Sequence, residues 1–333
     1  MANEINIILP PIVSFTLTFL LTPLIMNVMK RIGKTGIDVH KLNKPEIPEL
    51  GGISIIISIS ISVIVMYMLN ELSTIIIASL LTALIAGIIG LLDDLFDLGG
   101  ILKPALTIFA FLPIYTMEVY NPRPAIPFIP GTRLFIIYQL LLPFSIAVPA
   151  NAVNMLDVIN GATPLTTIPV FIALAVSGIL LGGRGIETMS FVAIASLIAF
   201  YYYNKYPAKT FIGNSGDFFI GGLIGALAVT GRLEIVGIVA LMPHIMNSFY
   251  ILGSIRRLFE HKTIKDKPTR LRDDGLLEAT DNPKAAVSLL RLLLMRGPEH
   301  EKELAYSLFL LSLLSCMLAI ITAYLTTIRL WGV

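Results

Sequence analysis

The chain has 333 residues, of which 56% are hydrophobic and only 14% are charged, and its mean hydropathy is +0.84. Because a soluble globular domain carries about 25% charged residues, this composition excludes a water-soluble protein. The formal net charge of +2 gives no sign of a nucleic-acid partner, and the single cysteine excludes a disulfide framework and a cysteine-based metal site.

Apolar segments divided by charges, glycines and prolines predict an all-α polytopic membrane protein with about ten transmembrane helices, built as one domain over residues 1–333. Crossing a bilayer takes about 20 residues, and several segments have that length whereas others have roughly 13 to 17. The first segment is too long for the hydrophobic region of a signal peptide, so we interpret it as a retained span. The eighth is rich in glycine, and we expect it either to begin before Gly213 or to be partly re-entrant. In chain order the segments are 6–29, 51–69, 74–92, 104–119, 134–149, 165–181, 189–203, 218–230, 235–255 and 304–328.

Basic residues are distributed unequally between the two sides of a ten-span arrangement. Of the 24 Lys and Arg residues, 19 fall on the side of the loops at about 30–50, 93–103, 150–164, 204–217 and 257–302, and 5 fall on the other side. The positive-inside rule therefore predicts a cytoplasmic active-site face built from these loops, with both termini extracytoplasmic. No internal repeat is evident, which disfavours a transporter built from matching halves.

Three acidic residues, Asp93, Asp94 and Asp97, lie at the end of the third segment, where charge near the membrane is costly. If the helix continues, Asp93 and Asp97 lie one turn apart on one face, with Asp94 beside them. Carboxylates this close repel one another unless a cation neutralises them. The cluster therefore favours a Mg²⁺ site completed by substrate phosphates over the alternative, a hydrated helix end.

A polar stripe follows the fifth segment. Asn151, Asn154 and Asp157 recur every three residues, so a helix would align them on an otherwise apolar surface, and Asn160 and Gly161 come directly after. Amide and carboxylate oxygens along one stripe suit a hard cation or the polar edge of a nucleotide. The alternative is a hydrogen-bonded stripe between helices in the bundle core.

Glycines surround Asn214 and Asp217 just before the eighth segment. A helix that begins after them would aim free N–H groups at an anion such as phosphate, while Asp217 equally fits an N-terminal cap.

Basic residues on the same side offer further anion-binding groups, namely Lys103 and the pair Arg270 and Arg272. In an extended stretch the paired arginines project to the same side, a geometry suited to bidentate phosphate contacts. The alternative is a polybasic segment held against anionic lipid head groups.

These four groups, in this order and on one side, resemble the polyprenyl-phosphate N-acetylhexosamine-1-phosphate transferases, and most closely the dolichyl-phosphate GlcNAc-1-phosphate transferases of eukaryotes and archaea. The resemblance covers nearly the whole chain. Residues 38–52 are similar to the family's first cytoplasmic loop and supply Asp38, Lys41 and Glu49. The residues that look like the family's Asp-Asp motif and its pyrophosphate-contacting lysine are Asp93, Asp94 and Lys103.

The later motifs resemble the dolichol branch in particular. Residues 151–161 are similar to the family's Asn-rich motif, in which the residue that matches Asn154 ligates the metal. Asn247 and the Arg270/Arg272 pair also look like this branch, since the bacterial peptidoglycan branch has a His cluster in the corresponding loop. Relatives have a metal-ligating Asp where this chain has Asn214, so the resemblance leaves Asn214 or Asp217 as the ligand. Leu271 replaces a His between the paired arginines, which bears on the sugar more than on the reaction.

The resemblance implies transfer of GlcNAc-1-phosphate from UDP-GlcNAc to a polyprenyl or dolichyl phosphate with release of UMP, the first membrane step of glycan assembly such as N-glycosylation. It implies Mg²⁺, with Mn²⁺ as an alternative, a lipid bilayer (the plasma membrane in a prokaryote), and the homodimers that occur in the family. The implied roles are catalytic for Asp93, Asp94 and Lys103; substrate-binding for Asp38, Lys41, Glu49, Asp97, Asn151, Asp157, Asn160, Gly161, Asn247, Arg270 and Arg272; and metal-ligating for Asn154, Asn214 and Asp217.

The sequence offers three alternatives to this function. The same reaction with a different UDP-HexNAc sugar stays within the family. An ion-coupled transporter would use the acids as an intramembrane relay, but they fall at span ends rather than at mid-membrane. A scaffold that docks its basic loop on lipid head groups would leave the Asp cluster and the Asn stripe unexplained.

Overall fold

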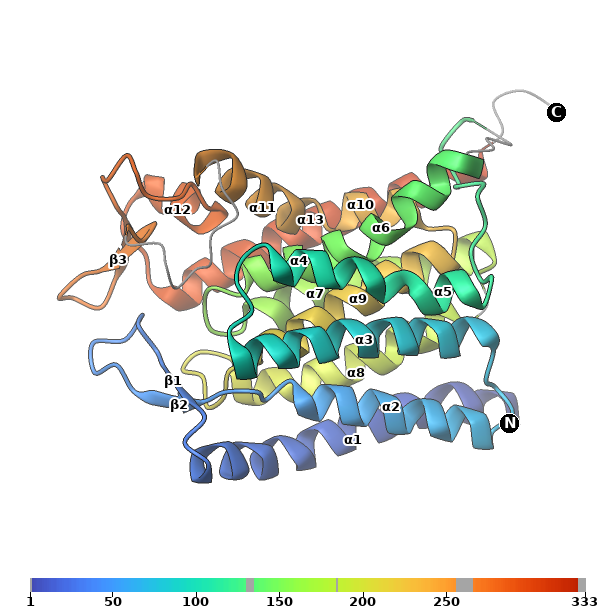
Figure 1. The fold of residues 1–333 in the computed structure, drawn as a ribbon, viewed down its shortest axis with the longest axis horizontal. Helices are drawn as coiled ribbons and strands as arrows, with labels where there is room; N and C mark the ends of the chain where they lie inside the picture. Colours follow the sequence, from blue (N-terminus) through green and yellow to red (C-terminus); the bar gives the residue numbers. More distant parts are fainter. Residues whose placement is uncertain (1, 130–134, 184, 256–265, 329–333) are drawn as a thin grey trace.

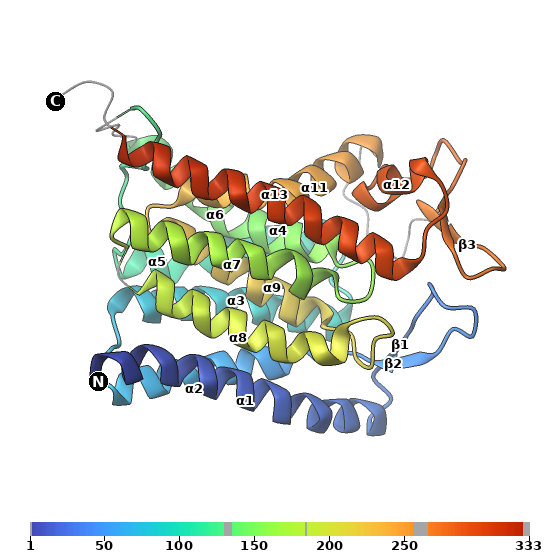
Figure 2. The same cartoon turned by 180° about the vertical axis from the view of Figure 1, so that it is seen from behind.

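Long apolar helices run side by side through the computed structural model, which describes residues 2–129, 135–183, 185–255 and 266–328 (Figures 1 and 2). The helices are α1 (Ala2–Arg31), α2 (Ile53–Met68), α3 (Thr74–Phe96), α4 (Leu102–Thr107), η1 (Ile108–Phe111), α5 (Leu112–Thr116), α6 (Phe135–Leu156), α7 (Ala162–Leu181), α8 (Ile186–Asn204), α9 (Gly213–Thr230), α10 (Glu234–Ala240), α11 (Met242–Ile255), α12 (Leu289–Leu293), η3 (Leu294–Arg296) and α13 (Glu301–Thr327). This arrangement confirms the predicted helical, multi-pass architecture.

Helix length and composition support fewer membrane crossings than the sequence predicted. In the described ranges, six helices are long and apolar enough to cross a membrane, namely α1, α3, α6, α7, α8 and α13. Helices α10 and α11 meet at a 67° bend and make a seventh crossing if they count as one span. Helix α2 and the rod Leu102–Thr116 are shorter apolar helices. Helix length and composition therefore support six or seven spans and do not confirm about ten; the predicted start of the fifth segment, Leu134, lies outside the described residues.

Helix α9 lies at the centre of the bundle, and this position explains its glycine-rich composition. It begins at Gly213, earlier than the predicted Phe218, and every residue from Ser215 to Thr230 is buried. Helices α3 and α6 pack along it. Small residues permit this approach, because a Cβ atom on Gly221 would lie 2.5 Å from the backbone oxygen of Pro149. A helix surrounded by protein does not need the long apolar side chains that face lipid.

The polar loops gather at one end of the bundle, on the left in Figure 1. Two antiparallel hairpins lie there: β1 (Thr35–Ile37) with β2 (Glu46–Pro48), and β3 (Thr269–Leu271) with β4 (Leu277–Ala279). The start of α1 and the end of α13 lie at the opposite end. The last turn of α3, the end of α6 and the start of α9 all reach the loop end, so the predicted polar motifs meet there.

Close packing between α3 and α9 yields a testable prediction. A Cβ atom on Gly90 would lie 2.3 Å from the backbone oxygen of Asn214. A backbone atom cannot move aside as the end of a flexible side chain can. We expect Gly90→Ala to cost about 1–3 kcal/mol, as overpacking does, and to lower the thermal unfolding midpoint measured in detergent. Gly99→Ala is the matched control, because a Cβ there meets nothing within 4 Å. Equal midpoints for the two variants would contradict this packing.

Candidate active site

The acidic end of α3 differs from the continuous helical face that the sequence predicted. The helix ends at Phe96, and Asp97 takes a left-handed conformation with φ 57°. The condition for that face, a helix that continues through Asp97, is therefore not met, although the Asp97 N–H still donates to the Asp93 backbone oxygen at 3.0 Å. The two carboxylates that stay in the helix, Asp93 and Asp94, project into different surroundings.

Asp93 is buried and bound on both oxygens. Its Oδ2 lies 2.5 Å from the Lys103 ammonium and accepts a 2.6 Å hydrogen bond from Asn214 Nδ2, while Oδ1 accepts the Leu98 N–H. The predicted neighbourhood of the Asp pair and Lys103 is therefore present. Lys103 is the second residue of α4, and its ammonium also lies over the Phe218 ring.

The carboxylate of Asp94, a residue of α3, lies against the N-terminus of α9. Its two carboxylate oxygens accept the backbone N–H groups of Asn214 and Ser215 at 3.0 and 2.9 Å. Free N–H groups and the helix dipole make such a terminus attractive to an anion. The sequence predicted N–H groups aimed at a phosphate, whereas the anion that they bind here is a carboxylate of the protein itself.

Asn154, Asn214 and Asp217 converge beside these acids. Asn154 Nδ2 donates to Asn214 Oδ1 at 2.6 Å and to Asp217 Oδ2 at 3.2 Å, and the Thr163 hydroxyl donates to Asp217 Oδ1 at 2.6 Å. Asp217 lies in the second turn of α9 and does not cap it, so the capping alternative is wrong. We call Asp93, Asp94, Lys103, Asn154, Asn214 and Asp217 together the carboxylate–amide cluster.

This cluster has the chemistry of a site for a hard cation. The Asn154 amide lies within hydrogen-bonding distance of an oxygen of Asn214 and an oxygen of the buried Asp217, and Mg²⁺ prefers oxygen ligands such as amides and carboxylates. Which atom of an amide faces inward is assigned from hydrogen bonds, so a rotation of Asn154 would present its oxygen instead. The residues present therefore fit the metal that the sequence predicted.

The predicted stripe along α6 is divided among different partners. Asn151 Nδ2 donates to the Thr107 hydroxyl at 2.9 Å and to the Ala147 oxygen, on a side that faces α4. The helix ends at Leu156, so Asp157 leaves the helical face and accepts the Thr163 N–H at 3.4 Å. Burial raises the pKa of Asp157 to about 6. Of the stripe, only Asn154 makes hydrogen bonds within the carboxylate–amide cluster.

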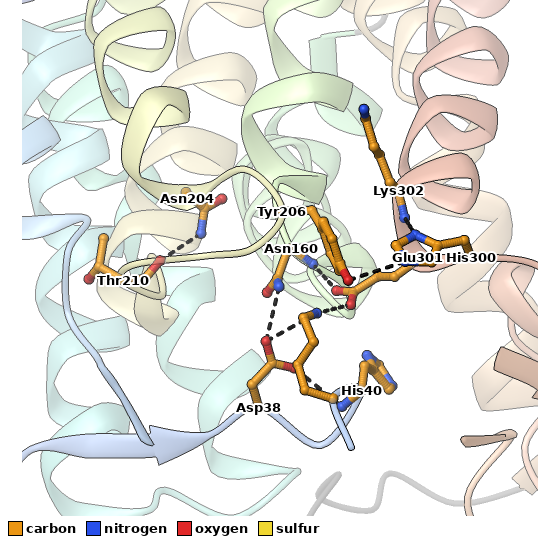
Figure 3. Close-up of polar contacts among 10 residues, drawn as sticks. Asp38, His40, Asn160, Asn204, Tyr206, Thr210, His300, Glu301 and Lys302 are labelled. Atoms are coloured by element: carbon orange, nitrogen blue, oxygen red, sulfur yellow. Dashed lines mark hydrogen bonds and ion pairs between the residues drawn. The ribbon is translucent and has the colours of Figure 1, made fainter. Parts of the chain in front are cut away.

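A second polar group holds residues from the loop between α1 and α2 and from the Asn-rich segment (Figure 3). Asp38 Oδ2 accepts Asn160 Nδ2 at 3.0 Å and lies 3.3 Å from the Lys41 ammonium. Glu301 pairs with Lys41 and accepts the Asn160 backbone N–H at 2.8 Å. We call Asp38, Lys41, Asn160 and Glu301 the loop clamp.

His40 and Gly161 border the loop clamp. Burial lowers the pKa of His40, against the opposite influence of Glu301 and Asp38. Asp38, His40 and Glu301 are also close enough for a metal ion, but Lys41 already neutralises the two acids. Gly161 has φ +81° and starts α7, which explains a glycine at that position.

Three further predicted residues, Asn247, Glu49 and Asp97, have other surroundings in the described part of the chain. Asn247 bonds to the Met155 oxygen and the Leu289 N–H, which ties α11 to the end of α6 and the start of α12. The Glu49 carboxyl packs against Gly36. Asp97 is exposed on the loop after α3.

Of the paired arginines, Arg270 lies in the strand β3, whereas Arg272 comes directly after the strand ends at Leu271. Arg270 pairs with Glu278 across the β3–β4 hairpin, and Arg272 lies 3.0 Å from Asp274. These residues, with Leu271 and Asp273, line an open hollow of about 420 Å³. Part of the basic loop that precedes them, residues 256–265, lies outside the described residues.

Sequence reasoning missed Thr163, Glu301, Tyr206 and Lys34. Lys34 donates to the Asp94 backbone oxygen at 2.7 Å, and the Lys41 ammonium lies 4.1 Å from the centre of the Tyr206 ring. Thr163 follows the Asn-rich motif directly, so proximity was an available signal. Glu301 was not recognisable, because an acid at the start of a helix is an ordinary capping feature.

Comparisons with known proteins identify the family of this chain. Residues 75–232 match glycosyl transferase family 4. Two archaeal relatives carry the name UDP-N-acetylglucosamine–dolichyl-phosphate N-acetylglucosaminephosphotransferase, in both cases as a provisional assignment. The protein of Sulfolobus acidocaldarius is 29% identical over 96% of this chain and 97% of its own length, and that of Saccharolobus solfataricus is 35% identical over 72% and 76%. A phospho-N-acetylmuramoyl-pentapeptide-transferase of Bacillus licheniformis is 30% identical over 68% and 75%. The chain belongs to glycosyl transferase family 4.

Proposed function

We propose that this protein transfers GlcNAc-1-phosphate from UDP-GlcNAc to dolichyl phosphate or another polyprenyl phosphate and releases UMP. The names of the two archaeal relatives support the substrates. The observation that carries the proposal is the convergence of the carboxylate–amide cluster beside Lys103, at the loop end of a bundle of apolar helices. Such a reaction forms the first lipid-linked product of a glycan assembly sequence.

The main physical demand is that two anions meet. An oxygen of the lipid phosphate forms a bond to the β-phosphorus of the nucleotide sugar, the bond from that phosphorus to the α–β bridging oxygen breaks, and UMP leaves with the electron pair. A phosphate monoester has a second pKa near ~6 and is largely dianionic at neutral pH, so a strong general base is not essential. Lys103 would neutralise charge at the reacting phosphates, while Asp93 orients the Lys103 ammonium.

Mg²⁺, with Mn²⁺ as an alternative, would supply Lewis-acid charge neutralisation when bound. We propose Asp217, Asn154 and Asn214 as its ligands, with Asp217 as the anionic one. Asn214 donates its amide to Asp93 at 2.6 Å, a contact that a second carboxylate at position 214 would turn into repulsion. This contact supports Asp217 over residue 214 as the source of the negative charge.

The loop clamp and the paired arginines would serve the nucleotide sugar. Asp157 lies on the loop between the carboxylate–amide cluster and Asn160 of the loop clamp, where Asp157 and Asn160 would border a nucleotide. Arg270 and Arg272 now pair with acids in their own hairpin, and we propose that phosphates of the substrate replace those acids. Six further residues would border the nucleotide sugar, namely Lys41, Glu49, Asp97, Asn151, Gly161 and Asn247.

We further propose ten membrane crossings, with the loop end in the cytoplasm and both termini outside. With α10 and α11 taken as one span, helix α2, the apolar segment Leu102–Thr116 and α9 would be the three crossings beyond the seven counted above. The distribution of Lys and Arg supports this orientation. A homodimer in a lipid bilayer is part of the same proposal, on resemblance to the family.

The reaction predicts a specific product pair. Purified protein in detergent with Mg²⁺, dolichyl phosphate and labelled UDP-GlcNAc should release UMP and move an equal amount of label into the organic phase. Release of UDP instead would mean that the sugar moved without its phosphate. Turnover with another UDP-sugar alone would reassign the donor, which is the alternative that Leu271 raises, and no turnover across a panel of donors and lipid phosphates would refute the transferase.

Asp94→Asn should reduce transfer by about 100-fold or more, because the site loses a charge that organises the reacting groups. The protein should still fold, since an Asn oxygen can accept one of the two α9 N–H groups that Asp94 now accepts. Initial rates and thermal unfolding would be measured on the same preparation. Glu187→Gln, at the start of α8 and thus at the opposite end of the bundle, is the control and should keep its rate. Near wild-type turnover of Asp94→Asn would remove Asp94 from the mechanism.

Metal binding by substituted proteins distinguishes Asp217 from Asn214 as the principal ligand. Chelation with EDTA should abolish turnover, and added Mg²⁺ should restore it. Asp217→Asn should weaken Mn²⁺ binding, followed by electron paramagnetic resonance of the free ion, by about tenfold or more, because a carboxylate binds a hard cation more strongly than an amide. Asn214→Ala should weaken it less. The reverse order would make position 214 the principal ligand.

A further inference from the structure

Glu301 is the one residue of the loop clamp that belongs to a membrane helix, and in the described chain it connects two separate loops. It is the first residue of α13, and only 2% of its surface is exposed. Oε1 accepts the Asn160 N–H, whereas Oε2 pairs with Lys41. Each oxygen therefore holds a different loop against the same helix end (Figure 3).

The contact with Asn160 is made through the main chain, so it constrains where the loop runs. Asn160 lies between Asn154, which bonds to Asn214 and Asp217, and Thr163, which bonds to Asp217. Glu301 thus anchors the middle of a segment whose two ends belong to or contact the carboxylate–amide cluster. Displacement of residue 160 would move both ends.

The buried ion pairs of the loop clamp oppose separation of its residues. Two buried carboxylates share one ammonium, which also lies against the Tyr206 ring, and the Tyr206 hydroxyl lies 3.2 Å from His300 Nε2. If Glu301 were lost, Lys41 would keep only Asp38, and the buried Asn160 N–H would lack its acceptor. Leaving a buried donor unpaired carries its full desolvation cost.

We propose that Glu301 is a positioning residue for binding of the nucleotide sugar, acting through Asn160 and Lys41. This inference rests on the proposed function for its substrate. An acid in the first turn of a helix is also favoured simply by the helix dipole, and Glu303 provides the comparison, because it lies in the same turn but is exposed.

The test compares Glu301→Ala, Glu301→Gln and Glu303→Ala in full-length protein by steady-state kinetics and by hydrogen–deuterium exchange. Glu301→Ala should raise KM for UDP-GlcNAc by about tenfold or more with kcat changed by less than about threefold, as expected when ordering of a binding loop is lost. Exchange should rise in residues 154–163 and 35–50. Glu301→Gln keeps an acceptor for the Asn160 N–H, so in this variant hydrogen–deuterium exchange should rise only in residues 35–50. Glu303→Ala should match wild type.

A fall in kcat with unchanged KM, or exchange in both loops equal to that of Glu303→Ala, would overturn the assignment. If wild-type protein shows no turnover, the proposed function fails, while the exchange data still decide whether Glu301 orders the two loops. If Glu301→Ala does not fold, Glu301→Gln carries the test, and unchanged exchange in residues 35–50 would refute the role of its ion pair with Lys41.

Discussion

Carboxylates buried at one end of a helical bundle are the constraint on which the rest of the structure depends. A charge removed from water costs several kcal/mol unless it gains partners, and these acids gain them from other helices. Asp93 takes Lys103 from α4, and Asp94 takes two N–H groups from α9. The end of α3 is thereby tied to the start of α9. Because α9 is the central helix, this tie also sets where the loops meet.

Position 214 shows how this constraint affects chemistry. The amide of Asn214 donates to Asp93 with one atom and accepts from Asn154 with the other, a combination that no carboxylate can provide at neutral pH. The buried carboxylate nearest to Asn154 is consequently Asp217, one helical turn further along α9. If Asp217 and the two amides hold the metal as proposed, the site keeps one negative charge although position 214 carries an amide.

Several predictions depended on local pattern and were confirmed for that reason. Apolar runs located the helices, and the Asp pair, Lys103, Asn154 and Asn214 do meet at one end of the bundle. Predictions that assumed a continuing helix were wrong, because α3 ends at Phe96 and α6 ends at Leu156. Asp97 and Asp157 therefore lie just beyond the helices that were expected to include them. Two or three residues of helix length decide such placements, and hydrophobic periodicity does not define helix ends that closely.

By itself, the sequence determined that the chain is a helical membrane protein and which polar motifs lie together at span ends, since hydropathy and charge act over short stretches of chain. Only the tertiary structure decided which partner each polar group takes. Asp94 binds N–H groups 120 residues away, and Lys41 pairs with Glu301 across 260 residues. Such pairings depend on how packed helices are rotated and where they end, and no local pattern carries that information.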